Sequence, residues 1–388
     1  MAAHPGMRFS VDPWDPSYGV SLDAADGQSQ QKVDVDVELL PDRWRPLDPE
    51  PGVAVPAAVL FVDGVRRVDA QVWVDGDAEG TEAVPALCAS YAAGVVCCCP
   101  QGGAHLAAAE VRRGLVTTAE HAEDVDTGAG RFVANMITTR PNQAPAQALS
   151  QRVQGLLNEV EVAAAGHARE LLGCDDDLIV VDGPLRGRDR LARAVGYVKT
   201  HHTAYLDAEQ NAVVARLGAG QRTPIFRLTS VGGFRRFTWY LRLPCPKGAP
   251  WAGVVRLECS AELAVADAVE LAGRTQVTLA RYASQGYKDA RAPQNLYPIA
   301  GLERALRRRL GDPGVLYRAL RTAAGRPLDA AAGRPAGRPS DAAAGRPVDA
   351  AAGRPVDAAA PDPAADGVAP VANLPERQRF VSLADLAG

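Results

Sequence analysis

Two Asp-Gly dipeptides, Asp63-Gly64 and Asp182-Gly183, each follow directly on a short apolar run. Each places a carboxylate where a predicted buried strand ends and where glycine lets the backbone turn. If the two strands are neighbours in one sheet, the carboxylates face each other across the usual strand spacing of about 5 Å. Two carboxylates this close repel each other unless a divalent cation lies between them, and oxygen-only ligands favour Mg²⁺ or Mn²⁺ over zinc. The alternative is that each aspartate only caps a turn.

Basic side chains follow both aspartates. Arg66 comes soon after Asp63, and residues 186–202 carry a local charge of +4 from Arg186, Arg188, Arg190, Arg193 and Lys199 against Asp189. These charges are suited to holding phosphates beside a metal, and such binding weakens as the salt concentration rises. In the pair His201-His202, adjacent strand side chains diverge, so only one is expected near a substrate, and His201 is our candidate. A second cluster, Arg304, Arg307, Arg308 and Arg309, fits either a phosphate contact or a solvated helix face.

These residues must be positioned by helices and strands, and the pattern of predicted elements indicates an α/β protein with a mixed sheet. Residues 57–67, 68–74 and 87–99 read as three strands with short connections, which predicts an antiparallel meander. Residues 144–172 have apolar positions spaced by three and four, as in a helix, and the next apolar run, 177–185, fits a strand reached by a parallel crossover. The stretch around Glu110 and Asp126 is assigned no element. Further strands are predicted at 191–198, 212–217, 224–229, 237–243 and 253–258, and helices at 262–281 and 302–320.

Outside a body at 31–323, the two ends of the chain differ in composition. Residues 1–30 are predicted to be an extended arm, and the alternating run at 33–39 to be an edge strand. Residues 324–373 repeat Gly-Arg-Pro-x-Asp-Ala-Ala-Ala with almost no apolar surface, which predicts a disordered linker. The last segment, 374–388, regains apolar residues at roughly helical spacing and is either a short docking helix or a frayed tail. Those residues are Phe380, Val381, Leu383 and Leu386.

The overall composition excludes several classes of protein. The chain has 388 residues, 47% of them hydrophobic, and a formal net charge of −4, so any contact with a polyanion must use local patches. Its apolar runs are far shorter than the roughly 20 residues of a membrane helix, and the N-terminus lacks a secretory leader, so we expect a cytoplasmic protein. Seven cysteines include the consecutive Cys97, Cys98 and Cys99. They lack the C-x-x-C spacing of zinc sites and are expected to pack in the core as reduced thiols.

The order of elements resembles an RNase H-like fold, in which three antiparallel strands precede a helix and a parallel strand. More narrowly, the segments at 61–67, 178–185 and 196–200 resemble the NurA family of DNA end-resection nucleases, and the resemblance extends over residues 57–310. It implies a divergent, actinobacterial-type member of that family, which is a Mn²⁺- or Mg²⁺-dependent deoxyribonuclease. Such an enzyme processes DNA ends in double-strand break repair. The resemblance implies exonuclease activity and leaves open whether the enzyme is also an endonuclease. It also implies a homodimer that works with a HerA-type hexameric ATPase on DNA in the cytoplasm, at the nucleoid.

The resemblance also implies which residues are catalytic and bind the metal. Asp63 and Asp182 match the two aspartates of the family motif. The third ligand in that family is a glutamate of the helix. Glu161 is our choice and Glu159 the alternative, because the two lie on different faces of the helix and only one can point to the sheet.

One segment departs from the family. The usual pattern Tyr-Pro-x-Pro-Leu-x-x-Ala-His is matched only in part by residues 292–300, and no histidine follows. Gln294 and Asn295 there offer neutral oxygens to a metal or a phosphate. The departure leaves open a non-catalytic NurA-like protein that binds DNA ends or a ring ATPase. A phosphotransferase of the sugar-kinase or actin type is disfavoured, because no glycine-rich phosphate loop follows either Asp-Gly.

Overall fold

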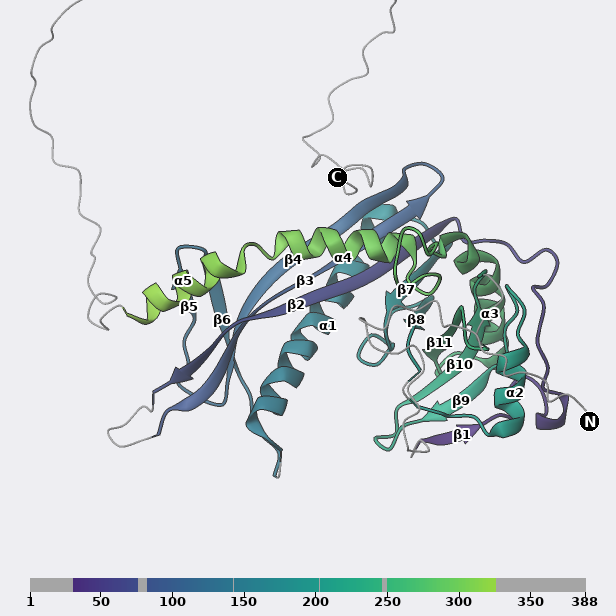
Figure 1. The fold of residues 1–388 in the computed structure, drawn as a ribbon, viewed down its shortest axis with the longest axis horizontal. Helices are drawn as coiled ribbons and strands as arrows, with labels where there is room; N and C mark the ends of the chain where they lie inside the picture. The colour runs from purple at the N-terminus through teal and green to yellow at the C-terminus, as the bar shows by residue number, and fades with distance from the viewer. Residues whose placement is uncertain (1–30, 76–81, 142, 202, 246–249, 326–388) are drawn as a thin grey trace, which may run out of the picture. The chain divides into compact units, whose positions relative to one another are not determined.

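The computed structural model describes residues 31–75, 82–141, 143–201, 203–245 and 250–325. Its described strands form one sheet in the order β1-β9-β10-β11-β8-β7-β2-β3-β4-β6-β5, with antiparallel and parallel pairs and with helices packed against it (Figure 1). The predicted α/β class with a mixed sheet is confirmed. The predicted arm, repeat linker and docking helix lie outside the described residues. No described helix combines the length and the apolar character that a membrane span requires.

The meander consists of three long antiparallel strands, β2 (Ala58–Val74), β3 (Val84–Cys99) and β4 (Gly103–Thr117). The prediction of separate strands at 57–67 and 68–74 was wrong, since β2 runs through both with only a shift of register between Val68 and Ala70. The third member, β4, comes from the stretch that was assigned no element. Its alanines have low strand propensity, but β3 is buried along nearly its whole length and needs a partner on each side. Two short strands, β5 (Val125–Thr127) and β6 (Gly130–Met136), complete this edge.

The crossover to the other half of the sheet follows the prediction. Helix α1 (Pro145–Leu172) begins with a proline in its first turn and ends at Gly173, whose φ of +58° is left-handed. Its apolar positions are buried against β2, β3 and β4. Strand β7 (Asp177–Asp182) pairs in parallel with β2, and β8 (Ala194–Val198) pairs in parallel with β7.

The second half of the sheet continues with β11 (Val254–Ser260), β10 (Arg235–Arg242), β9 (Phe226–Thr229) and β1 (Lys32–Asp34). The strand predicted at 212–217 is instead part of helix α2 (Ala208–Arg216). The carboxylate of Asp207 accepts hydrogen bonds from the Glu209 and Gln210 amides and so caps the start of α2. The apolar run that suggested a strand is the buried face of this helix, which packs on Phe226 and Tyr240.

Three helices follow the last strand. Helix α3 (Val265–Leu279) lies where it was predicted and continues into a 3₁₀ turn, η3 (Ala280–Tyr282); a similar turn, η2 (Pro41–Arg43), lies near the start of the described chain. The single helix predicted at 302–320 is two, α4 (Tyr297–Arg309) and α5 (Pro313–Ala324). Gly311, at φ +81°, and Pro313 separate them, because neither fits the interior of a helix.

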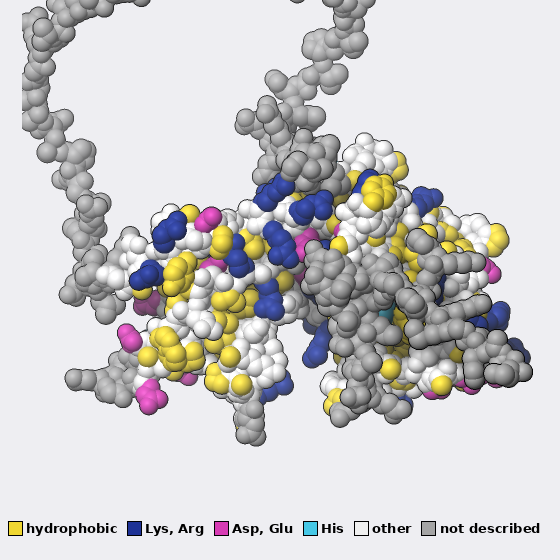
Figure 2. Space-filling view, viewed as in Figure 1, with side chains coloured by type: hydrophobic (Ala, Val, Ile, Leu, Met, Phe, Trp, Pro, Cys, Tyr) yellow, Lys and Arg dark blue, Asp and Glu magenta, His cyan; other side chains and the backbone are white. Residues whose placement is uncertain are grey.

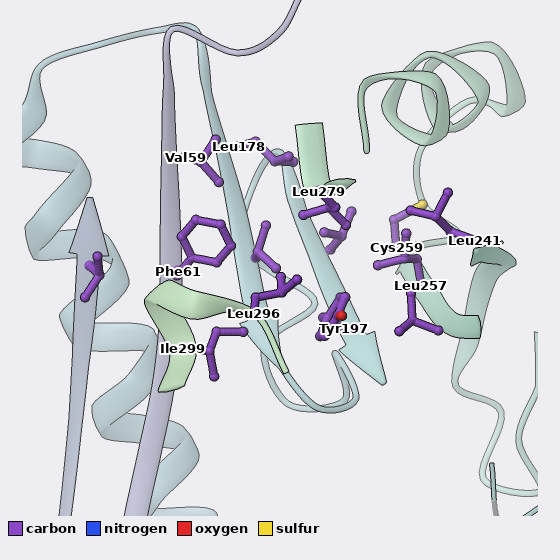
Figure 3. Packing of buried hydrophobic residues seen from close by; sticks show 14 of the residues in the cluster. Val59, Phe61, Leu178, Tyr197, Leu241, Leu257, Cys259, Leu279, Leu296 and Ile299 are labelled. Atoms are coloured by element: carbon purple, nitrogen blue, oxygen red, sulfur yellow. The ribbon is translucent and has the colours of Figure 1, made fainter. Parts of the chain in front are cut away.

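The core is divided by the sheet, because successive strand side chains point to opposite faces. Val59 and Phe61 of β2 pack with Leu178, Tyr197 and residues of α3 and α4 on one face (Figure 3). Leu60 and Val62 pack against α1 on the other face. In Figure 1, α1 and α4 accordingly cross β2 to β4 on opposite sides. By the same alternation Asp63 belongs to the face of α4, and Gly64 to the face of α1.

Candidate active site

Asp63 and Asp182 lie at the point where two parallel strands separate. The pairing of β2 with β7 ends at Val62 and Val181, and each aspartate is the next residue along its strand. Strand β7 ends there as predicted, but the prediction that a strand also ends at Asp63-Gly64 was wrong, because β2 continues through both residues, paired with β3. Burial raises the pKa of Asp63 well above its usual value, and the charge of Asp182 raises it further. The two carboxylates therefore form a pair in which one member is strongly disfavoured as an anion.

The turn after Asp182 is held in place by glycine and by a buried acid. Gly183 has a φ of +94° and its amide donates to the Tyr197 carbonyl at 2.8 Å. A side chain at Gly196 would put a Cβ 2.7 Å from the Leu185 nitrogen, so this glycine lets the turn lie directly on β8. The Leu185 amide donates to Glu258 of β11 at 2.7 Å. These contacts fix the direction in which Asp182 leaves the sheet.

Among the described residues, hydrogen-bond partners are found for only one oxygen of Asp182. Lys199, directly after β8, donates from Nζ to Asp182 Oδ2 at 2.7 Å and to Asn295 Oδ1 at 3.1 Å. Asp182 Oδ1 is buried without a partner among the described residues. A buried carboxylate oxygen without a donor is costly, and a cation or a hydrogen-bond donor arriving there would stabilise it.

Helix α1 brings Glu161 to the sheet and leaves Glu159 on the surface. A Cβ placed on Gly64 would lie 2.5 Å from Glu161 Oε1, so the absence of a side chain there makes room for the carboxylate. Burial raises the pKa of Glu161, although Arg188, which forms a buried ion pair with it, acts in the opposite direction. Glu159 is exposed and pairs with Arg152 at 2.7 Å.

Sequence reasoning missed an acid of α4, Glu303. It belongs to α4, the helix that packs on the face of the sheet to which Asp63 belongs, and its charge is among those that raise the pKa of Asp63. Burial alone would raise the pKa of Glu303, but hydrogen bonds from Arg291 and Arg307 bring it below its usual value. In the sequence Glu303 is hidden at the start of a basic cluster. The available signal is that it is the only acid in α4.

The predicted substrate-binding residues have different environments. Lys199 and Asn295 lie at the aspartate pair. Gln294, the residue before Asn295, is fully buried, and neither polar atom of its side-chain amide has a hydrogen-bond partner among the described residues. Arg66 and Arg186 are exposed, whereas Arg188 is buried and bound to Glu161. His201 is buried too. Its Nε2 donates to the Val254 carbonyl at 3.0 Å, and its ring packs on Tyr240 and Trp251.

A pocket of about 510 Å³ opens beside Asp182. Among the residues that line it are Lys199, Arg256, Arg291 and the aromatic Tyr205. A second positive surface lies on α4, where Arg304, Arg307, Arg308 and Arg309 are exposed. Figure 2 shows Lys and Arg side chains gathered along α4 and α5. Both surfaces suit a phosphate backbone.

The aspartate pair suits a hard divalent cation. Asp182 Oδ1 is available, Asp63 is buried beside it, and both offer carboxylate oxygens, the ligands that Mg²⁺ and Mn²⁺ prefer. Glu161 is engaged by Arg188 and would have to leave it to become a ligand. In the described part of the chain, three potential ligand atoms lie within 4.8 Å of one another only at Cys97, Cys99 and His105, so the three carboxylates are not drawn together as tightly.

The comparison with protein families bears on the same residues. Residues 136–305 match the family described as the NurA domain. The match includes Glu161, Asp182, Lys199 and Glu303, while Asp63 of β2 precedes it. No curated protein matches the chain. The matched segment supplies α1, β7, β8 and most of the helix that carries Glu303, and this match supports membership of the NurA family, a family of nucleases.

Proposed function

We propose that this chain is a metal-dependent DNA nuclease that hydrolyses phosphodiester bonds at DNA ends. The observation that carries the proposal is the pair formed by the buried Asp63 of β2 and the partly buried Asp182, at the point where β7 ends and separates from β2. One of their oxygens has no donor in the described part of the chain, and a pocket lined with basic side chains adjoins Asp182. Two carboxylates held side by side, one of them buried, contribute nothing to the packing of the core. The free-energy cost of placing them next to each other is explained if they bind a cation that in turn contacts a phosphate.

Each group has a separate task in this proposal. Asp63 and Asp182 would hold Mn²⁺ or Mg²⁺, which supplies Lewis-acid character and a more acidic bound water. Glu161, which lies beside Gly64 on the α1 side, would become the third ligand once it leaves Arg188. Lys199 bridges Asp182 and Asn295 and so holds a positive charge where a phosphate oxygen would lie. Arg291 adds charge to the wall of the pocket, and the ring of Tyr205 offers a surface on which a base can stack.

The partners we propose follow from the family resemblance. The sequence contains no G-x-x-x-x-G-K-[ST] phosphate loop, so a processive enzyme would need a separate motor. We propose a homodimer that acts with a HerA-type hexameric ATPase on DNA ends in double-strand break repair, at the nucleoid. The exposed arginines of α4 would then add sequence-independent contacts to the DNA backbone.

A second candidate is a non-catalytic NurA-like adaptor. The ion pair between Glu161 and Arg188 favours it, because this pair neutralises the third carboxylate without a metal. The missing histidine after residues 292–300 favours it too. Such a protein would bind DNA or the ATPase through the same positive surfaces and leave the DNA intact.

One experiment separates the two candidates. The full-length protein is incubated with linear double-stranded and single-stranded DNA in Mn²⁺, in Mg²⁺ and in EDTA, beside Asp63→Asn, Asp182→Asn and the exposed control Asp126→Asn. We expect metal-dependent cleavage by the wild type and the control, and a loss of about 100-fold or more in the two site variants. Intact DNA in every metal, with binding retained, would support the adaptor. Full cleavage by both site variants would remove the aspartates from the site.

A further inference from the structure

A second cluster of potential ligands lies at the hairpin between β3 and β4, apart from the carboxylates. One ligand atom each of Cys97, Cys99 and His105 lies within 4.8 Å of the other two. Cys97 and His105 are directly paired across the two strands. Cys99 is two residues beyond Cys97 and therefore on the same face of the sheet. The register of the hairpin thus brings two thiols and an imidazole together.

These separations are close to those of a tetrahedral zinc site. Zinc binds sulfur at about 2.3 Å and nitrogen at about 2.0 Å, which puts tetrahedral ligand atoms roughly 3.5–4 Å apart. From 4.8 Å the side chains need to approach by only about 1 Å, which rotamer changes at the end of a hairpin can provide. Sulfur and imidazole select zinc over the Mg²⁺ or Mn²⁺ suited to the carboxylates.

The backbone of the turn supports the same residues. The Gly102 amide donates to Cys99 Sγ at 3.4 Å, a contact that favours a negatively charged sulfur. A Cβ on Gly102 would lie 2.9 Å from the His105 ring, so glycine is what allows the ring to lie over the turn. His105 Nδ1 faces the Gly103 carbonyl at 3.4 Å. A backbone carbonyl in this position is a common means of orienting a histidine that binds metal.

A fourth sulfur lines the same pocket. This pocket, of about 810 Å³, is bordered by Cys97, Cys99, His105 and Cys174. Cys174 follows Gly173, the left-handed residue at which α1 ends. A ligand from this position would join the end of α1 to the hairpin. The donor set would then be three sulfurs and one nitrogen, a common composition of structural zinc sites.

We propose that Cys97, Cys99 and His105 bind one Zn²⁺ ion, with Cys174 as the fourth ligand. The ion has a structural role: it holds the C-terminal end of α1, the helix that carries Glu161, against the β3–β4 hairpin. The expectation that all three consecutive cysteines are core thiols holds for Cys98, which points to the opposite face and packs in the core there. It holds for Cys97 too, which is buried in the core on the face of α1, while Cys99 is half-buried. A search for C-x-x-C pairs does not find this cluster, because its third ligand comes from the next strand.

Metal analysis of the full-length protein tests the proposal. The protein is produced in zinc-supplemented medium, purified without chelators, and its zinc content is measured beside Cys97→Ser, His105→Ala and Cys98→Ser. Cys98→Ser is the matched control, because it makes the same change in the same strand on the other face. We expect about one zinc per chain in the wild type and in Cys98→Ser, and little in the other two. Removing the zinc should lower the melting temperature of the wild type, and adding it back should restore that temperature.

Two further measurements keep the proposal open to refutation if a variant fails to fold. Titration of the metal-free wild type with Co²⁺ should produce a thiolate-to-cobalt charge-transfer band, and Cys174→Ser should weaken zinc binding at least about tenfold. A wild type that takes up neither zinc nor cobalt would overturn the site, as would Cys97→Ser with full zinc content. Unchanged affinity in Cys174→Ser would remove that ligand. None of these readouts depends on nuclease activity.

Discussion

Lys199 and Asp182 show how incomplete pairing at a single residue marks a site. A buried carboxylate in a purely structural role has both of its oxygens satisfied, as Asp177 has through Arg169 and Arg193. Asp182 has one oxygen bound to Lys199, and the residues that the structure describes provide no donor for the other. The same strand, β7, thus begins with a satisfied acid and ends with an unsatisfied one. This difference in hydrogen bonding distinguishes a structural carboxylate, Asp177, from one that can bind a ligand, Asp182.

Glu161 and Glu159 should respond differently to the same substitution. Glu161→Gln should abolish cleavage and leave Arg188 as an unpaired buried charge, at a cost of about 3–5 kcal/mol in unfolding free energy. Glu159→Gln removes only an exposed pair with Arg152, so cleavage should persist and stability change by less than about 1 kcal/mol. Cleavage assays and urea unfolding of both variants measure these effects.

A double variant separates the catalytic from the structural contribution of Glu161. Glu161→Gln with Arg188→Gln removes both charges and should recover a large part of the lost stability while cleavage remains absent. If cleavage returned together with stability, Glu161 would be only a partner of Arg188, and the helix would contribute no ligand.

Glu258 should make the stability of the protein depend on pH in the acid range. Burial would raise the pKa of Glu258, but Arg256, Arg236 and the Leu185 amide together hold it below its usual value. Because its folded pKa is lower than the unfolded value of about 4.3, its stabilising effect is complete above that pH and is lost as the pH falls through the folded pKa. Glu258→Gln should therefore cost about 3–5 kcal/mol near neutrality, and less below pH ~4. Urea unfolding from pH 7 to pH 3 measures this difference, and a gap that stayed constant would contradict the role of its charge.

The packing of α1 on β2 depends, at the scale of elements, on a glycine in the strand. Gly64→Ala would put a methyl group 2.5 Å from Glu161 Oε1 and 2.7 Å from Leu157 Cδ1, so α1 must shift. We expect a loss of about 1–3 kcal/mol in stability, and reduced cleavage because Glu161 moves. Gly166→Ala in α1 is the matched control: its Cβ meets nothing within 4 Å, and alanine should stabilise the helix by up to about 1 kcal/mol. Thermal melts of the two variants should move in opposite directions.

At the scale of the whole molecule, we expect that the repeat segment does not contribute to the stability of the folded body. Its sequence between Thr322 and Leu374 carries five Arg against six Asp and almost no large apolar residues. A chain ending at Gly325 keeps α5 intact, and we expect it to melt at the wild-type temperature and to cleave short DNA within a few-fold of the wild-type rate. A markedly lower melting temperature would instead show that the deleted segment stabilises the body.

The last fifteen residues have a separate expected role. Removing residues 374–388 should weaken capture of the HerA-type ATPase without changing cleavage, because Phe380, Val381, Leu383 and Leu386 are the apolar group available for such a contact. Pull-down with full-length and shortened chains measures it. Equal recovery of the ATPase would move the contact to residues 31–325.

Local patterns in the sequence were sufficient for α1 and for β7 with Asp182 at its end. A periodicity of three and four identifies a helix, and a short apolar run that ends in Asp-Gly identifies a strand and an acid at its end. Because a helix precedes β7, the sequence also predicted a parallel crossover onto the sheet, but that β7 pairs with β2 itself was only a condition in the sequence analysis and is decided by the structure.

Features that depend on distant partners were decided only by the tertiary structure. The alanine-rich β4 is a strand because β3 needs a neighbour, and 208–216 is a helix because Asp207 caps it and its apolar face is covered. Arg188 was expected at a phosphate but is bound to Glu161, and the charge of Glu303 acts on Asp63 from a helix more than 200 residues away in the chain. Cys97 and His105 meet only through the register of a hairpin. In each case a residue's type limits which partners it can have, whereas packing across the sheet determines which of them it meets.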